Sequence, residues 1–260
     1  MTDPRLQITS KEDQISSPWW GIHEARYRFA LKYVAGDKLL DIACGTGYGL
    51  PILLSAVKYV VGVDIDAPAL LSASRELIGL NGSLVLARGC CLPFHDDAFD
   101  AVTSFETIEH LQDRFTFVAE LARVLAPGGV CILSTPNATY TRPPNGKPRN
   151  PYHIHEYVPS EFHALLARYF KSIDLLGQRL RPAFVISPFW DDQQHLRTAR
   201  EVCRLVLWRI LNRLPRLARE SLSKALWGHP FTPDCTDYIF SASGLDAAPV
   251  QVAICRSPIK

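Results

Sequence analysis

The segment Lys38–Gly49, KLLDIACGTGYG, joins an apolar run of strand length to a glycine-rich turn. The run extends from Leu39 to Ala43, and Asp41 lies within it. The residues that follow the turn, Leu50 to Lys58, are apolar and long enough for a helix. Glycine lets backbone N–H groups approach a ligand closely, and a helix start offers further unpaired N–H donors. The order strand, glycine turn, helix is therefore typical of a nucleotide-binding site.

A second strand-like run, Tyr59 to Ile65, carries Asp64 near its end. A carboxylate at this place can accept hydrogen bonds from ribose hydroxyls. A glycine turn without a ligand is the simplest alternative, but the turn and the acid together favour nucleotide binding. A nicotinamide-dependent dehydrogenase is a further alternative. It is disfavoured because Leu50 stands where the last glycine of G-x-G-x-x-G should fall.

The sequence resembles the class I S-adenosylmethionine-dependent methyltransferases, whose first motif is an acidic residue followed by a glycine-rich turn. That motif is Asp41-Ile-Ala-Cys-Gly45-Thr-Gly47 here, and Asp64 matches the ribose-binding acid of the family. Ala43 departs from the family pattern because it replaces the usual first glycine. We expect a slightly displaced loop that still binds S-adenosylmethionine. The resemblance also extends cofactor binding to the neighbouring Tyr48 and Ile65.

Composition and charge indicate a globular chain without a general affinity for polyanions. The chain has 260 residues, 47% of them hydrophobic and 21% charged, which is enough for one large domain or two small ones. The formal net charge of +2 gives no electrostatic case for nucleic acid or for an anionic membrane. We therefore expect a small-molecule substrate and no nucleic-acid partner.

Seven cysteines are scattered along the chain without a C-x-x-C pair, which favours reduced, mostly buried thiols in a cytoplasmic protein. The first 18 residues are polar, and we expect a mobile arm there. No apolar run approaches the length needed to span a bilayer.

Apolar strand-like runs alternate with helix-like segments along residues 19–260, which we assign to one methyltransferase domain. The alternation predicts an α/β fold, a doubly wound and mostly parallel sheet of seven strands. Residues 190–228 interrupt it, because Gln193 to Leu226 is long, Arg-rich and apolar at helical spacing. We expect a helical insert before the last strand, Val250 to Cys255. Two readings of this insert stay open, a cap over the substrate and extra packing or an oligomer interface.

The family resemblance points to two further places around the cofactor. The helix before the first strand, Gly21 to Ala35, carries Tyr27 as a lid contact, although packing against the sheet is an equal alternative. The adenine site follows the third strand at Arg88-Gly-Cys-Cys-Leu-Pro-Phe94, where Cys90 replaces the customary Asp. Cys90, Cys91 and Leu92 are therefore cofactor candidates, and buried core thiols are the alternative for the two cysteines.

The fourth strand ends in Ser104-Phe-Glu-Thr-Ile-Glu-His-Leu111. If a helical turn starts at Glu106, then Glu109 and His110 lie on the same side as Glu106. Two carboxylates and an imidazole so close together suit an acid–base site or a metal site. An ordinary solvated helix start is the alternative. We also count Glu106 among the cofactor-binding residues.

A later His-x-x-Glu, with His153 as its histidine, extends this pattern. The combination is similar to that of small-RNA 3′-terminal 2′-O-methyltransferases, in which two Glu and two His bind a divalent ion. An E-x-x-E-H motif also occurs in ubiquinone-biosynthesis O-methyltransferases. With TPN, here Thr135-Pro-Asn137, it occurs in bacterial methyltransferases of sugars and natural products.

We expect O-methylation of a hydroxyl on a small molecule, with His110 as general base. If a metal is present, Glu106, Glu109, His110 and His153 are its expected ligands, and Mn, Fe, Co, Zn or Mg are its candidates. Two other functions remain open, methylation of an RNA 3′ end and a non-catalytic protein that binds S-adenosylmethionine.

Overall fold

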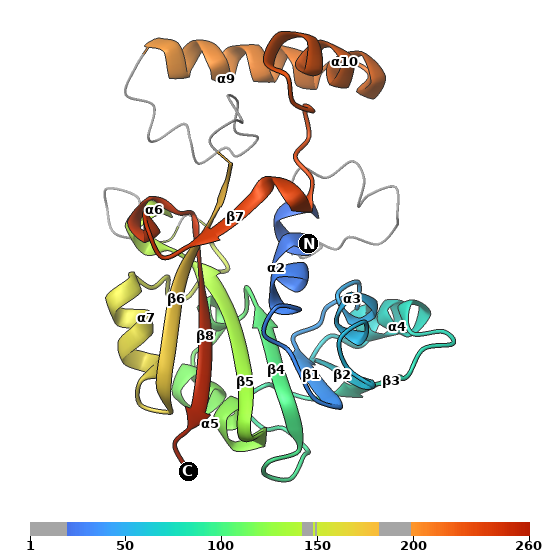
Figure 1. The fold of residues 1–260 in the computed structure, drawn as a ribbon, viewed down its shortest axis with the longest axis vertical. Coiled ribbons are helices and arrows are strands. Elements are labelled where there is room, and N and C mark those ends of the chain that lie inside the picture. Colours follow the sequence, from blue (N-terminus) through green and yellow to red (C-terminus); the bar gives the residue numbers. More distant parts are fainter. Residues whose placement is uncertain (1–19, 142–147, 149, 182–198) are drawn as a thin grey trace.

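The structure is a computed structural model that describes residues 20–141, 148, 150–181 and 199–260. It is built around one eight-stranded sheet with the order β3-β2-β1-β4-β5-β8-β6-β7 (Figure 1). The predicted arm, residues 1–18, and the first part of the predicted insert, residues 190–198, lie outside the described residues.

The sheet is mixed but mostly parallel. Its strands are β1 (Lys38–Ile42), β2 (Tyr59–Asp64), β3 (Gly82–Leu86), β4 (Phe99–Phe105), β5 (Leu125–Pro136), β6 (Phe170–Leu180), β7 (Tyr238–Ser241) and β8 (Val250–Pro258). The first five strands pair in parallel, while β8 runs antiparallel between β5 and β6. This confirms the predicted fold class with one difference. The short edge strand β7, antiparallel to β6, is an eighth strand that the sequence did not reveal.

Helices cover both faces of the sheet. The helices of the described residues are α2 (Trp20–Ala30), α3 (Leu50–Leu54), α4 (Ala67–Glu76), α5 (Arg114–Val124), α6 (Ala138–Thr141), α7 (Pro159–Leu166), α9 (Ala199–Asn212) and α10 (Arg216–Trp227), of which α9 and α10 lie apart from the sheet (Figure 1). The described residues also form three short 3₁₀ turns, η1 (Ile108–His110), η2 (Cys235–Asp237) and η3 (Leu245–Ala247). The helix after the glycine turn, predicted to reach Lys58, ends at Leu54. At that end the Ser55 hydroxyl donates to the Ile52 carbonyl, a local bond that competes with helix continuation.

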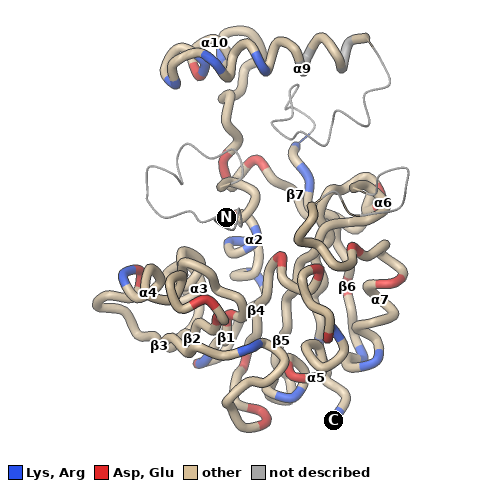
Figure 2. Tube along the Cα trace, turned by 180° about the vertical axis from the view of Figure 1, so that it is seen from behind, with Lys and Arg blue, Asp and Glu red and all other residues tan. Residues whose placement is uncertain are grey.

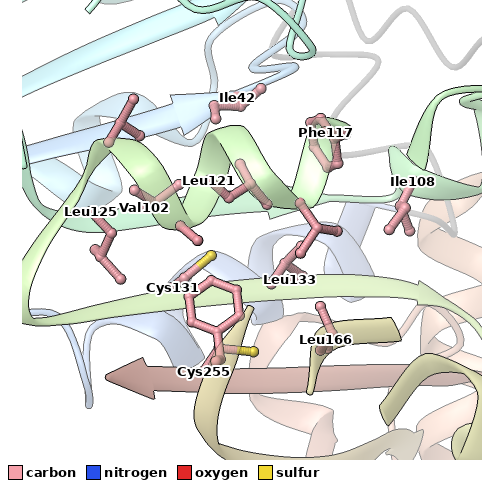
Figure 3. Close-up of a cluster of buried hydrophobic side chains, with 14 of the residues drawn as sticks. Ile42, Val102, Ile108, Phe117, Leu121, Leu125, Cys131, Leu133, Leu166 and Cys255 are labelled. Atoms are coloured by element: carbon pink, nitrogen blue, oxygen red, sulfur yellow. The ribbon is translucent and has the colours of Figure 1, made fainter. Parts of the chain in front are cut away.

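Two apolar cores lie on opposite faces of the sheet, because successive strand residues point to opposite sides. Leu39, Val60 and Ile132 belong to the core under α2, α3 and α4, whereas Leu40, Val61 and Leu133 belong to the core under α5 and α7. Figure 3 shows the second core, where Phe117 and Leu121 of α5 pack against Val102 and Ile42. This double cover fixes the sheet and leaves the ends of its strands to carry the site.

The carboxyl ends of β1, β2, β4 and β5 gather at one edge of the sheet, because these strands are parallel neighbours. Asp41, Asp64, Glu106 and Thr135 lie at or next to those ends. Open α/β sheets bind their ligands there. No helix in the described part of the chain combines the length and the apolar character required to cross a bilayer.

Candidate functional site

The turn after β1 depends on left-handed backbone conformations. The φ angles are 59° at Ala43, 55° at Gly45 and 79° at Gly47. Ala43 therefore adopts the conformation of the glycine that it replaces, at a cost of about 1 kcal/mol for an L-residue. Gly47 has a second constraint, since a Cβ there would lie 2.5 Å from the Cβ of Ala73. The turn thus keeps its close fit to α4.

Asp64 ties the turn after β1 to the turn after β2. Its carboxylate accepts the N–H of Gly45 at 2.7 Å and the N–H of Asp66 at 2.9 Å. The next side chain, Ile65, is exposed. The predicted ribose acid and the predicted apolar neighbour therefore lie directly beside the glycine turn.

Asp41 is buried and serves as an acceptor within the protein. Its carboxylate accepts the Thr103 hydroxyl at 2.7 Å and the Tyr27 hydroxyl at 3.1 Å. Burial raises the pKa of Asp41 from 3.8 to about 7, although the two hydrogen bonds act in the opposite direction. Asp41 therefore joins α2, β1 and β4 beneath the glycine turn.

Aromatic rings from three elements pack edge to face above Asp41. The ring of Tyr27 lies 5.3 Å from that of Tyr48 and 5.0 Å from that of Phe105, and Tyr48 lies 4.7 Å from Trp20. Gly49 makes room for this cluster, because a Cβ there would lie 2.1 Å from the Tyr27 ring. Tyr27 is therefore a buried packing residue in this structure, the alternative to the predicted lid contact.

The predicted adenine residues separate into different environments. Leu92 is buried in the core, and its N–H donates to Glu120 at 2.7 Å. The Cys90 thiol lies 3.4 Å from the Asp113 carbonyl, while Cys91 is exposed. Leu92 is therefore enclosed in the core, whereas Cys90 is half-buried and Cys91 is exposed.

Glu106 is held by groups from two other elements. Its Oε1 lies 2.7 Å from the guanidinium Nη1 of Arg26 and accepts the Ser134 hydroxyl at 2.8 Å. Arg26 is buried on α2, and its Nη1 also donates to the Ser134 hydroxyl oxygen at 3.1 Å. Glu106 has a φ of 53°, so the chain turns sharply at the end of β4. Its carboxylate is therefore part of an Arg–Glu–Ser network beside the aromatic cluster.

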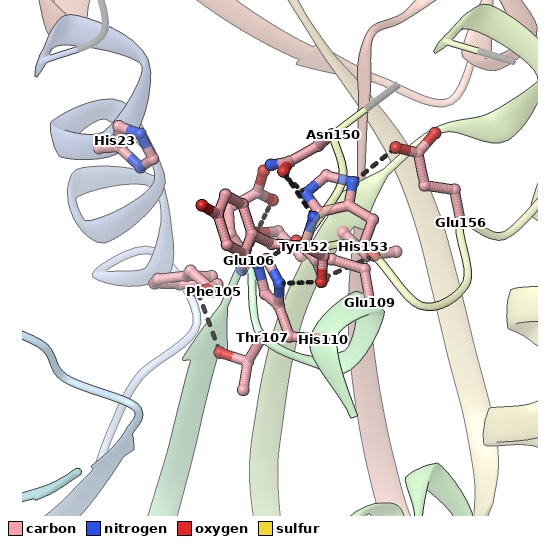
Figure 4. A network of polar contacts seen from close by, with 12 residues as sticks. His23, Phe105, Glu106, Thr107, Glu109, His110, Asn150, Tyr152, His153 and Glu156 are labelled. Atoms are coloured by element: carbon pink, nitrogen blue, oxygen red, sulfur yellow. Dashed lines mark hydrogen bonds and ion pairs between the residues drawn. The ribbon is translucent and has the colours of Figure 1, made fainter. Parts of the chain in front are cut away.

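Glu109, His110 and His153 form a separate cluster (Figure 4). One ligand-type atom from each residue lies within 4.8 Å of those of the other two. The rings of His110 and His153 lie 4.8 Å apart, nearly perpendicular at 78°. The structure thus brings together three of the four predicted metal ligands, and Glu106 stands outside this group.

The hydrogen bonds of the two histidines indicate their tautomers. Nδ1 of His110 lies 3.0 Å from the Tyr152 carbonyl, which can only accept, so in the neutral ring Nε2 carries the lone pair. Nδ1 of His153 lies 2.5 Å from the Glu156 carboxylate, and Asn150 donates its side-chain N–H to Nε2 of His153 at 2.9 Å. Both rings therefore direct a basic Nε2 away from their Nδ1 anchors.

Glu109 is buried, and its two carboxylate oxygens differ. Oε2 accepts the Thr135 hydroxyl at 2.9 Å, whereas Oε1 has no hydrogen-bond partner among the described residues and lies 4.0 Å from Nε2 of His110. Burial, with a smaller contribution from Glu106, raises the pKa of Glu109 well above its ordinary value. A positive charge near Oε1, on His110 or on a bound cation, would lower that pKa again.

Several groups that position this site carry no recognisable signal in the sequence. Arg26 and Thr103 come from an ordinary helix and strand, and only the folded sheet brings them to Glu106 and Asp41. Asn150 lies in the polar loop after β5, and nothing in its sequence context indicated contact with His153. Glu156, in contrast, was part of the His-x-x-Glu spacing.

Comparison with known proteins shows what part of this chain is similar to them. Residues 40–133 match the family model described as a methyltransferase domain. A probable S-adenosylmethionine-dependent methyltransferase of Mycolicibacterium smegmatis is 34% identical over 151 residues, which are 57% of each chain. A probable S-adenosylmethionine-dependent methyltransferase of Mycobacterium tuberculosis, Rv3030, is 34% identical over 153 residues, 58% of this chain and 55% of the relative. The chain thus matches a little over half the length of these relatives.

The fold is also similar to that of solved structures. The YcgJ protein from Bacillus subtilis superposes with a TM-score of 0.56 at 22% identity, covering 90% of this chain and 99% of that protein. At this identity the likeness concerns the fold alone.

Proposed function

We propose that the chain transfers the methyl group of S-adenosylmethionine to a hydroxyl of a small molecule, because residues 40–133 match a methyltransferase domain and probable S-adenosylmethionine-dependent methyltransferases are 34% identical over a little over half of the chain. A sugar or another natural-product intermediate is the acceptor class that we favour. The observation that carries this proposal is the His110 imidazole, whose Nδ1 is anchored on the Tyr152 carbonyl so that its Nε2 can take a proton.

The cofactor residues support the first half of the proposal. S-adenosylmethionine supplies a methyl group already activated by its sulfonium, so the protein has mainly to position the acceptor and remove its proton. The backbone of the turn around Gly45 and Gly47 would approach the cofactor, and Asp64 would accept its ribose hydroxyls. Tyr48 lies in the same turn and Ile65 follows Asp64 directly, while Cys91 lies in the turn after β3.

The catalytic residues support the second half. Nε2 of His110 accepts the hydroxyl proton, and Oε1 of Glu109, at 4.0 Å, stabilises the imidazolium that forms. The hydrogen bond from Thr135 fixes the other oxygen of Glu109. Glu106 acts from the neighbouring Arg26 network, where it shapes the end of β4.

A metal-assisted version of the same reaction is a second proposal. The ion would be bound by Oε1 of Glu109, which has no hydrogen-bond partner among the described residues, and by the Nε2 atoms of His110 and His153. His153 would exchange its Asn150 contact for the ion, and its contact with Glu156 is typical of a metal-bound histidine. A divalent ion there would lower the pKa of the acceptor hydroxyl.

Two other functions are separable by experiment. RNA 2′-O-methylation requires phosphate contacts, so retention of an oligonucleotide at low salt is its test. A non-catalytic S-adenosylmethionine-binding protein would bind the cofactor without turnover.

All seven cysteines are free, which suits the cytoplasmic location that we propose. An oligomer through the helical insert also stays a proposal.

The test is a radiolabelled methyl-transfer screen over sugars, phenols, carboxylic acids and short RNAs, with and without chelator. We expect label in a hydroxylated small molecule, lost in His110→Ala and kept in His163→Ala, a matched change of an exposed histidine on α7. Transfer that His110→Ala leaves intact would remove the proposed base. Loss of transfer in chelator, restored by added divalent ion, would select the metal-assisted version.

A further inference from the structure

The α9–α10 pair, residues 199–227, is the most positively charged part of the chain. It contains seven Arg or Lys and two Glu, a net charge of +5, whereas the whole chain carries only +2. The remainder of the chain is therefore acidic, at −3. Figure 2 shows blue segments on the helix pair, with a red one on α10, and both red and blue segments scattered over the rest of the molecule. The small overall charge thus hides a strongly basic surface.

Apolar side chains are exposed along the same two helices. On α9 they are Val202, Val206 and Ile210, exposed by 48%, 48% and 52%. On α10 they include Leu222 and Leu226, exposed by 42% and 59%. Their spacing of four residues places each set on one helical face. Each helix therefore carries an exposed apolar stripe.

The inward side of α10 is polar, which is the reverse of an ordinary surface helix. Ser223 is buried, and the Glu220 carboxylate accepts the backbone N–H groups of Phe231 and Thr232, at 2.8 and 3.3 Å. Leu222 and Leu226 are therefore exposed because α10 contacts the rest of the protein through its polar side.

Aromatic contacts anchor the pair to the segment that leads on to β7. The ring of Trp208 on α9 stacks on Phe231 at 5.7 Å, and the guanidinium of Arg219 on α10 lies 5.3 Å from the same ring. Leu211 is buried beside them. These contacts use one side of each helix and leave the Val and Leu stripes uncovered by the described residues.

We propose that the α9–α10 pair is a docking surface for an anionic lipid bilayer. Exposed apolar stripes on helices that are rich in arginine and lysine are the features of helices that lie in a membrane interface. The positive charge complements anionic headgroups, each basic residue near such a surface contributing about fivefold in affinity. Neither helix is long and apolar enough to cross a bilayer, so the pair lies on the surface. Figure 1 shows the pair beyond the sheet, set apart from the α/β layers.

Vesicle flotation of the purified full chain tests this docking. We expect binding to vesicles that contain phosphatidylglycerol, weakened by added salt, and little binding to phosphatidylcholine alone. The double variant Leu222→Ser/Leu226→Ser should bind at least about tenfold more weakly. Its matched control is Ile78→Ser, which changes another exposed apolar residue, and it should bind like the wild type.

A charge reversal separates electrostatic docking from loss of folding. Arg216→Glu/Lys224→Glu keeps good helix formers and should also reduce binding by about tenfold or more, whereas Lys171→Glu at the other end of the molecule should not. Circular dichroism confirms that each variant is folded. The proposal is overturned if the wild type does not float with anionic vesicles or if these variants float equally well. A dimer that Leu222→Ser/Leu226→Ser dissociates would overturn it too, by assigning the face to a second copy.

Discussion

Replacement of Asp41 by Asn should remove a pH-dependent loss of stability. Asp41 is buried beneath the glycine turn, and its pKa of about 7 lies well above the ordinary value of 3.8. An acid whose pKa is raised in the folded state binds its proton more tightly there than in the unfolded chain. Its contribution to stability is therefore fully present below about pH 4 and is lost as the pH rises to about 7.

The shift sets the magnitude of the effect. A rise of roughly three units corresponds to about 4 kcal/mol in total. Ionisation of the unfolded chain already removes about 1.5 kcal/mol of this by pH 5, so about 2.5 kcal/mol should be lost between about pH 5 and pH 8. Asn cannot ionise, yet its carbonyl can still accept the Tyr27 hydroxyl. Asp41→Asn should therefore lack this part of the pH dependence.

Urea unfolding followed by tryptophan fluorescence at the two pH values measures the difference. The other titrating groups are common to both proteins, so subtracting the variant from the wild type isolates Asp41. The free energy of unfolding of the wild type should fall by about 2.5 kcal/mol more than that of the variant. Parallel pH dependences in the two proteins would refute the assignment of a raised pKa to this buried carboxyl.

Three further substitutions test the packing around the site by urea unfolding. Gly49→Ala should lower the free energy of unfolding by about 1–3 kcal/mol, because the added Cβ would lie 2.1 Å from the Tyr27 ring. An unchanged midpoint would show that the ring can move aside. Ala43→Gly should stabilise by up to about 1 kcal/mol by relieving a φ of 59°, so a destabilised variant would speak against strain there. Arg26→Met should lower the free energy of unfolding by about 3 kcal/mol, because it leaves Glu106 without its ion-pair partner. Adding Glu106→Gln should restore part of this stability. If it restores none, the lost ion pair is not the cause.

The fold could be predicted from local patterns because the parallel strands contain short apolar runs, most of them separated from the next by a helical period. The strand at the edge of the sheet could not be predicted in this way. β7, Tyr238–Ser241, has four residues, and it is a strand only because it pairs with β6 across the helical insert. Such pairing depends on long-range packing that four residues do not encode.

The candidate site was predictable where its residues share one motif. Glu109 and His110 are neighbours in the E-x-x-E-H pattern, and His153 joined them through its His-x-x-Glu spacing. The separation of Glu106 from that cluster was not predictable, because it depends on the buried Arg26 of α2. Spacing along the chain places side chains on one side of a turn, but a distant ion pair decides which of them face each other.

Calorimetric titration with S-adenosylmethionine and with its demethylated product tests the central claim most directly. We expect binding by the wild-type chain, weakened by about tenfold to a hundredfold in Asp64→Asn, which removes the charge of the ribose acceptor, and unchanged in the exposed control Asp246→Asn. The absence of heat with both ligands would contradict the assignment of the turn after β1 as a cofactor site. Equal affinities of the wild type and Asp64→Asn would contradict the role of Asp64.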